Sequence, residues 1–183
     1  MKRQALIFLA EGFEEVEALT VVDLLRRAEI ETKMVSITGD KKVTGSHGIA
    51  VEADVLFAEA DVTESDAYIL PGGMPGTRNL EACAPLIDVL NQANEKGKLL
   101  CAICAAPLVL GVNHLLEGKK ASCYPGFEKD LRGALVSYDL VSKQDNVITS
   151  RGMGTAISFA AEIIKTLLDE KTAEEIKESI IYK

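Results

Sequence analysis

The chain of 183 residues carries 28 acidic and 20 basic side chains, which give a formal net charge of −8 and a sequence pI of about 4.9. A surface with this excess of negative charge repels a phosphate backbone, so we expect no binding to nucleic acid. With 48% hydrophobic and 26% charged residues, the composition is typical of a globular protein and excludes a disordered or fibrous one. The length suits one domain with a real core, and we predict a single domain over residues 1–183.

The apolar run near the N-terminus is too short for a secretory signal or a membrane anchor. It covers residues 5–10 and ends at Glu11. A signal peptide needs roughly 7–15 apolar residues in its core, and a membrane-spanning helix needs about 20. We therefore expect a cytoplasmic protein without a membrane partner.

Strand-like and helix-like segments alternate along most of the chain. Apolar runs predict buried strands, and apolar residues three or four positions apart predict helices. Strands separated by helices predict an α/β fold with a doubly wound, mostly parallel sheet that has helices on both faces. The expected strands are 4–9, 32–37, 67–70, 98–103 and 147–150, the expected helices are 14–28, one starting near Pro85, 105–110 and 155–168, and peripheral strands are expected at 121–123 and 135–141.

Two further segments carry local signals. Residues 42–57 contain Thr44-Gly45 and His47-Gly48, which predict a loop with a small hairpin. Thr172 is followed three residues later by Glu175, a capping-box pattern that predicts the start of the last helix.

Cys104 stands where an apolar strand runs directly into a helix. Small residues follow it as far as Pro107, which suits a first helical turn. This arrangement resembles a strand-to-helix nucleophile elbow, in which small neighbours allow a sharp turn. A thiol at a helix N-terminus is favoured as the thiolate, so we expect a lowered pKa for Cys104. The alternative, that Cys104 is a small buried hydrophobic residue, remains open on spacing alone.

The four cysteines are Cys83, Cys101, Cys104 and Cys123, and we expect all of them to be free thiols. Cys101 and Cys104 match a C-x-x-C pattern. If Cys101 lies in an extended strand, the two Cα atoms are roughly 10 Å apart. A disulfide needs Cα atoms closer than about 7 Å, and no second pair of ligands completes a zinc set. We expect neither a redox pair nor a metal there.

Three loops are expected to meet Cys104 at the edge of the sheet, because ligands of open α/β sheets bind beyond the carboxyl ends of the strands. The loop after the first strand carries four glutamates, including Glu14, Glu15 and Glu17. The loop after the third strand contains Gly72 and Gly73, whose N–H groups can face an anion. The loop after the late strand, residues 150–155, brings the guanidinium of Arg151 to the start of a helix. Taken singly, each loop has a purely structural explanation, but together with the thiol they predict a site.

On these motifs the chain resembles the parkinsonism-associated deglycase family, part of the ThiJ/PfpI group of flavodoxin-like proteins, as a bacterial-type member. The resemblance implies that Cys104 is the reactive cysteine and that Glu17 is the acid hydrogen-bonded to it. It also implies a homodimer without cofactor or metal. The matching segments are Glu14-Glu-Val-Glu17, Leu70-Pro-Gly-Gly73, Ala102-Ile-Cys-Ala-Ala-Pro107 and Thr149-Ser-Arg-Gly152.

The resemblance implies further roles around the cysteine. Gly72, Gly73 and Ala105 would form a backbone pocket for a substrate oxygen. Arg151 matches a family arginine near the dimer contact, where Glu14 and Glu15 are expected as well.

Two positions differ from the family pattern. Tyr124 stands where some members have a histidine beside the cysteine, and Met153 replaces a proline that often occurs in the arginine motif. We expect the two histidines of the chain, His47 and His114, to be structural. A protease activity therefore lacks its usual base.

The expected function is that of a cofactor-independent enzyme with a cysteine nucleophile, of the glyoxalase or deglycase type. The resemblance implies small α-oxoaldehydes such as methylglyoxal, or their early adducts on proteins, as substrates. The alternative is a redox sensor or chaperone-like stress protein that works through oxidation of Cys104. An amidotransferase-like or hydrolase role would share the elbow, but it needs the absent histidine.

Overall fold

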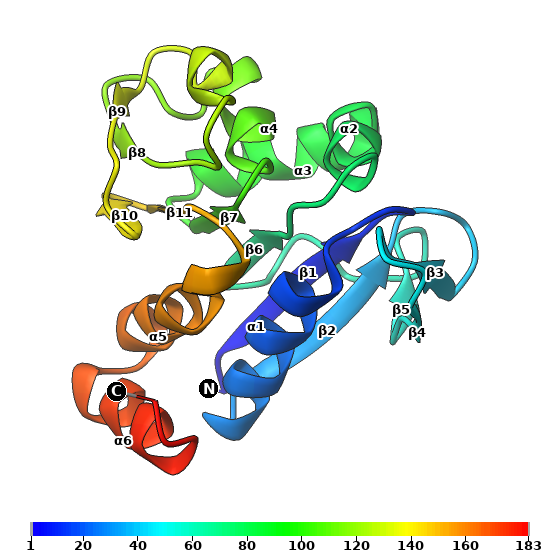
Figure 1. Ribbon diagram of the computed structural model, residues 1–183. Helices are drawn as coiled ribbons and strands as arrows, with labels where there is room; N and C mark the ends of the chain where they lie inside the picture. Colours follow the sequence, from blue (N-terminus) through cyan, green and yellow to red (C-terminus); the bar gives the residue numbers. More distant parts are fainter. Residues whose placement is uncertain (1, 183) are drawn as a thin grey trace.

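A seven-stranded sheet runs through the middle of the molecule in the computed structural model, which describes residues 2–182 (Figure 1). Its neighbouring strands are parallel, except for one antiparallel pair, β10 and β11, at an edge. This confirms the predicted mostly parallel α/β sheet. In spatial order the strands are β10 (Val141–Gln144), β11 (Val147–Ser150), β7 (Leu99–Ile103), β6 (Ala67–Leu70), β1 (Gln4–Leu9), β2 (Glu31–Ser36) and β5 (Val55–Leu56).

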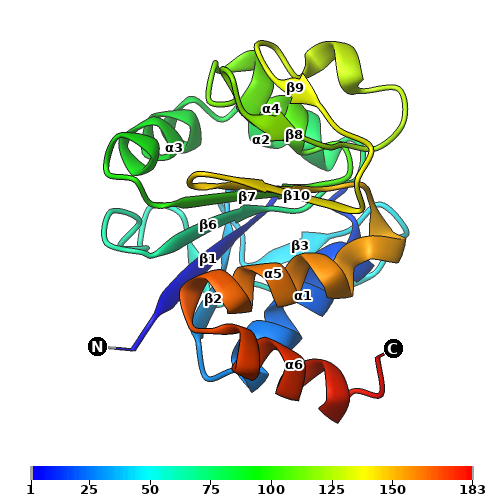
Figure 2. The same ribbon diagram turned by 90° about the vertical axis from the view of Figure 1, so that its left-hand side faces the viewer.

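Helices cover both faces of this sheet (Figure 2). One face is covered by α1 (Glu15–Arg27) and α5 (Ala156–Leu167), with α6 (Glu170–Ser179) packed outside them. The other face is covered by α2 (Gly76–Glu81), α3 (Ala84–Glu95) and α4 (Pro107–Val112). Within residues 2–182, no helix combines the length and the apolar character needed to cross a membrane.

Several smaller elements lie outside the seven-stranded sheet. A hairpin is formed by β3 (Lys42–Thr44) and β4 (Ala50–Glu52), and a short parallel pair by β8 (Lys120–Ala121) and β9 (Leu135–Val136). Two single 3₁₀ turns, Glu128–Asp130 and Met153–Thr155, complete the described elements.

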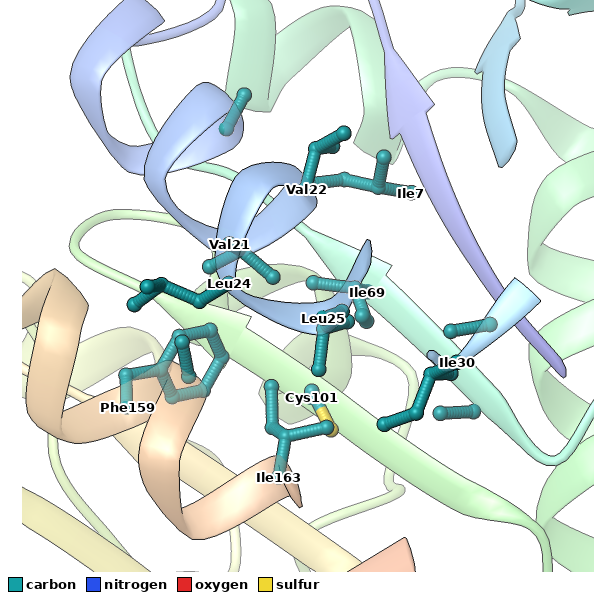
Figure 3. Close-up of a cluster of buried hydrophobic side chains, with 14 of the residues drawn as sticks. Ile7, Val21, Val22, Leu24, Leu25, Ile30, Ile69, Cys101, Phe159 and Ile163 are labelled. Atoms are coloured by element: carbon teal, nitrogen blue, oxygen red, sulfur yellow. The ribbon is translucent and has the colours of Figure 1, made fainter. Parts of the chain in front are cut away.

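The core between the sheet and α1 and α5 explains why these segments fold as they do. Residues of α1 at helical spacing, such as Val21 and Leu25, point toward the sheet, where strands that are apolar throughout present Ile7 and Ile69 (Figure 3). Phe159 of α5 fills the remaining space and is fully buried. Alternating strand residues contribute to a second hydrophobic cluster on the opposite face, so both faces of the sheet are buried.

The structure differs from the prediction in four features, and each difference has a physical reason. The last helix begins at Glu170 rather than near Thr172, because Asp169 is its N-cap and accepts the N–H of Thr172 at 2.7 Å. Helix α2 was not expected, because its short sequence shows too little periodicity. The segment 42–57 ends in an additional strand, β5, which pairs with β2. The run 135–141 divides into β9 and β10, which belong to different sheets.

We expect the substitution Phe159→Ala to lower the free energy of unfolding by about 3–5 kcal/mol, because it removes a fully buried ring and leaves a cavity between α1 and the sheet. Urea denaturation with a fixed m-value measures the change. Leu168→Ala is the matched control, since this side chain, just after α5, is 40% exposed. A change below about 1 kcal/mol for Phe159→Ala would contradict the packing described here.

Candidate functional site

The site lies where the order of strands in the sheet reverses. From β1 the chain proceeds outward through β2 to β5, and then returns to build β6, β7 and β11 on the other side of β1. The chain therefore leaves β1 and β6 in opposite directions. The crevice between the two loops, beyond the carboxyl ends of these strands, is where open α/β sheets bind ligands. Glu17 follows β1, Gly72 and Gly73 follow β6, and Cys104 follows β7.

Backbone contacts hold the first two of these loops together. The N–H of Glu14 donates to the carbonyl oxygen of Gly72 at 2.8 Å, and the N–H of Gly76 donates to that of Gly12 at 3.1 Å. Gly73 has a φ of +92°, and a Cβ built on it would lie 2.4 Å from the backbone nitrogen of Glu14. Only glycine fits this position, because both the conformation and the close approach exclude a side chain.

Cys104 occupies a strained backbone conformation, with a φ of 64° in the left-handed region. Two neighbouring segments hold it there. Its N–H donates to the carbonyl oxygen of Ser150 at 2.9 Å, and its carbonyl oxygen accepts the N–H of Tyr124 at 2.7 Å. A residue with a strained backbone between a strand and a helix is the defining feature of an elbow, so the predicted turn is confirmed.

Glu17 is buried and directed at the same point. Its Oε2 accepts the N–H of Gly72 at 2.8 Å, and its carboxyl group also hydrogen-bonds the thiol of Cys104. A Cβ on Gly72 would lie 2.6 Å from both the Cβ of Cys104 and Oε2 of Glu17. The missing side chain of Gly72 is therefore what allows the carboxyl group and the thiol to meet.

Burial sets the protonation of this pair. It raises the pKa of Glu17 to about 7, against the opposing effect of hydrogen bonds from Cys104 and from the Gly72 N–H. Burial and the adjacent Glu17 carboxylate also raise the pKa of Cys104 to about 12, although hydrogen bonds from the Ala105 and Gly73 N–H groups act in the opposite direction. Near neutral pH the thiol is protonated, while the carboxyl group is close to half ionised.

The expectation of a thiolate favoured by a helix N-terminus is thus corrected. Helix α4 begins only at Pro107 and has six residues, so its dipole is small and lies beyond the turn. The same burial that brings Glu17 to the thiol penalises the negative sulfur. What the arrangement offers instead is a carboxylate base in hydrogen-bond contact with a thiol.

The predicted backbone pocket is changed in one respect. The N–H of Gly72 already donates to Glu17 and is not available to a substrate oxygen. The N–H groups of Gly73 and Ala105 both reach the sulfur of Cys104, so they face the place where a bond to sulfur would form. These two amides are the backbone donors that the structure directs at the sulfur.

The other cysteines lie apart from this group. Cys101 is buried on the face of the sheet toward α1 and α5, where burial raises the pKa of its thiol well above the usual value (Figure 3). Cys123 is buried in the cluster on the opposite face, and Cys83 precedes α3. All four are free thiols, as expected.

Tyr124 and Arg151 border the elbow without joining the Cys104–Glu17 contact. The backbone N–H of Tyr124 donates a hydrogen bond to Cys104. Its side chain is half exposed, and the ring lies next to the backbone of Gly152. The guanidinium of Arg151 lies 5.7 Å from the ring centroid of Tyr138. Met153 is exposed, and no described contact explains why it replaces a proline.

Glu14 and Glu15 form a separate group at the start of α1. Their carboxylates point to Ser46 and His47 in the turn between β3 and β4. The sequence predicts only a structural role for His47 and not its contact with Glu15. No local pattern could reveal that contact, because more than thirty residues separate the two segments. His114 is exposed and pairs only with Glu117 among the residues described.

Comparison with known proteins agrees with this architecture. The family model described as the DJ-1/PfpI family matches residues 3–166. The chain therefore belongs to the DJ-1/PfpI family. Among solved structures, the oxidized DJ-1 of Toxoplasma gondii is similar, with a TM-score of 0.94 and 35% identity over 98% of both chains.

Two curated relatives illustrate the range of the family. The chain is 36% identical to Protein DJ-1 homolog B of Arabidopsis thaliana over 99% of its own length and 42% of the relative's, so it spans less than half of that protein. It is 32% identical to the glutathione-independent glyoxalase DJR-1.2 of Caenorhabditis elegans, with 96% of this chain and 95% of the relative covered.

We expect alkylation of Cys104 by iodoacetamide to accelerate as the pH rises through about 7, because the Glu17 carboxylate then accepts the thiol proton. In Glu17→Gln the increase near pH 7 should disappear. Peptide mapping after labelling at several pH values measures the rate, with Cys83 as the internal reference. A Cys104 rate in Glu17→Gln that still rises around pH 7 would rule out Glu17 as the base.

Proposed function

We propose that this protein is a cofactor-independent enzyme that converts small α-oxoaldehydes such as methylglyoxal to hydroxy acids, with Cys104 as nucleophile and Glu17 as acid–base group. The observation that carries the proposal is the contact of a buried, partly ionised carboxyl group with the only thiol at the elbow. The relative named as a glutathione-independent glyoxalase supports the substrate class. Repair of early glycation adducts would differ in the first step: the Cys104 sulfur would displace the protein amine or thiol from the former aldehyde carbon, and Glu17 would pass the thiol proton to the leaving group.

The proposed reaction begins with sulfur attack on the aldehyde carbon. The S–C bond forms while Glu17 accepts the thiol proton, and the aldehyde oxygen takes up negative charge opposite the Gly73 and Ala105 N–H groups. Return of the proton to this oxygen gives a hemithioacetal. No external base is needed, which is consistent with the absence of a histidine among the contacts described for Cys104.

Glu17 would then move a proton between the two substrate carbons. It removes the proton from the carbon bonded to sulfur and delivers it to the adjacent carbonyl carbon through an enediol. The first carbon is oxidised to a thioester and the second is reduced to an alcohol, so no external oxidant is required. Water cleaves the thioester, releases lactate and restores the thiol.

A redox sensor is the second candidate, and the same contact favours it. A carboxyl group whose pKa is about 7 can donate a hydrogen bond to an oxidised sulfur and stabilise a sulfenic or sulfinic acid. In this case peroxide would be the co-reactant and no aldehyde would turn over. Peroxide titration followed by intact mass distinguishes a stoichiometric oxidation from catalysis.

We expect Cys104→Ala to abolish turnover of methylglyoxal and Glu17→Gln to lower it by about 10²–10⁴-fold, the usual contribution of a positioned acid–base group. Cys83→Ala is the matched control and should retain wild-type rates, because Cys83 lies outside the site. Production of lactate is the measurement. Wild-type turnover in Cys104→Ala would refute the mechanism.

We also propose a homodimer. Val16, Leu19 and Ile49 expose apolar side chains, and the first two lie on α1 beside the turn that carries the third. Grouped apolar side chains of this kind are typical of a subunit contact. In sedimentation experiments we expect about twice the chain mass of 19.7 kDa.

Val16→Asp should shift the protein toward the monomer, since this side chain is 47% exposed and its replacement brings charge into the contact. Leu135→Asp is the control, because Leu135 is also apolar and, at 63%, more exposed than Val16, but it lies on β9, away from α1. A wild-type monomer at micromolar concentration would contradict the dimer.

A further inference from the structure

Four side-chain donor atoms from two distant segments converge outside the Cys104 site. Glu14 and Glu15 come from the start of α1, and Ser46 and His47 from the turn between β3 and β4 (Figure 1). Nδ1 of His47 lies 3.1 Å from Oε2 of Glu15 and 3.4 Å from Oε2 of Glu14. Oγ of Ser46 lies 3.1 Å from the same Nδ1, and 3.2 and 3.4 Å from the two carboxylate oxygens.

These separations match the edges of a small coordination polyhedron. Nitrogen and oxygen ligands bind zinc at about 2.0–2.1 Å, and a tetrahedron with such bonds has edges of about 3.3 Å. The five separations in the cluster run from 3.1 to 3.4 Å. A cation at the centre would therefore need little movement of the side chains.

The charge of the cluster also favours a cation. The carboxyl group of Glu15 is buried, accepts the backbone N–H groups of His47 and Ile49, and lies 3.1 Å from Nδ1 of His47. Glu14 places a second carboxylate beside it. Among residues 2–182, neither carboxylate forms an ion pair with a lysine or arginine, and His47 is their one basic partner.

The Glu15 carboxylate is held in place before any ligand arrives. Its other oxygen, Oε1, accepts the N–H groups of His47 at 2.8 Å and of Ile49 at 3.3 Å. A Cβ on Gly45 would lie 2.2 Å from the carboxyl carbon of Glu15, so the turn closes directly over this group. Oε1 is thus fixed by the backbone while Oε2 faces the cluster, as supporting contacts orient the ligands of metal sites.

We propose that Glu14, Glu15 and His47 bind one divalent transition-metal ion of the zinc type. Nδ1 of the imidazole and one oxygen of each carboxylate are the protein ligands, and Ser46 or water completes the coordination. One imidazole with two carboxylates is a donor set suited to zinc. The ion links the hairpin β3–β4 to the first turn of α1, the helix that carries Glu17.

Zinc titration by calorimetry tests the proposal, with the full chain as Cys104→Ala so that the reactive thiol contributes no ligand. We expect one zinc ion per chain, bound at least about tenfold more weakly in His47→Gln and in Glu14→Gln. Both side chains are near the surface, whereas Glu15 is buried and its substitution would risk unfolding.

His114→Gln is the matched control, because Nδ1 of His114 also lies close to a carboxylate, 3.0 Å from Glu117, but lacks a second one. It should bind zinc as the parent does. Absence of stoichiometric zinc binding, equal affinity in His47→Gln, or loss of binding in His114→Gln would overturn the proposal.

Discussion

A buried carboxyl group in contact with a thiol is the interaction on which the rest of this structure depends. Glu17 and Cys104 come from opposite sides of the strand reversal, and they meet because Gly72 has no side chain to separate them. Burial raises both pKa values, so near neutral pH the thiol keeps its proton while the carboxyl group of Glu17 is close to half ionised. In the proposed mechanism the carboxylate, rather than a helix dipole, promotes sulfur attack by accepting the thiol proton.

Much of the fold could be predicted from the sequence because its strands are buried on both faces. Mostly apolar segments such as Gln4–Leu9, Ala67–Leu70 and Val147–Ser150 have the same bounds in the structure as in the prediction. Helix α2 and strand β5 were not predicted, because they are too short to show a periodic pattern of apolar residues. They form through tertiary contacts. The start of α6 was misplaced because two capping patterns lie close together, and Asp169 rather than Thr172 makes the bond.

For the site, the motifs identified which residues come together but not their energetics. The positions of Glu17, Gly72, Gly73 and Cys104 follow from strand ends and small residues. The direction of the Cys104 pKa shift does not, because it depends on how deeply the thiol and Glu17 are buried together. The same holds for two contacts between distant segments. No local sequence pattern predicts that Glu17 accepts the Gly72 N–H or that His47 lies beside Glu15.

The left-handed backbone at Cys104 has a consequence for how this sequence can change. At a φ of 64° a glycine would be less strained than any residue with a Cβ, so the backbone alone favours losing the cysteine. The substitution Cys104→Gly would therefore relieve strain in the backbone while it removes the thiol, so the stability of this turn and the chemistry proposed for it favour different residues.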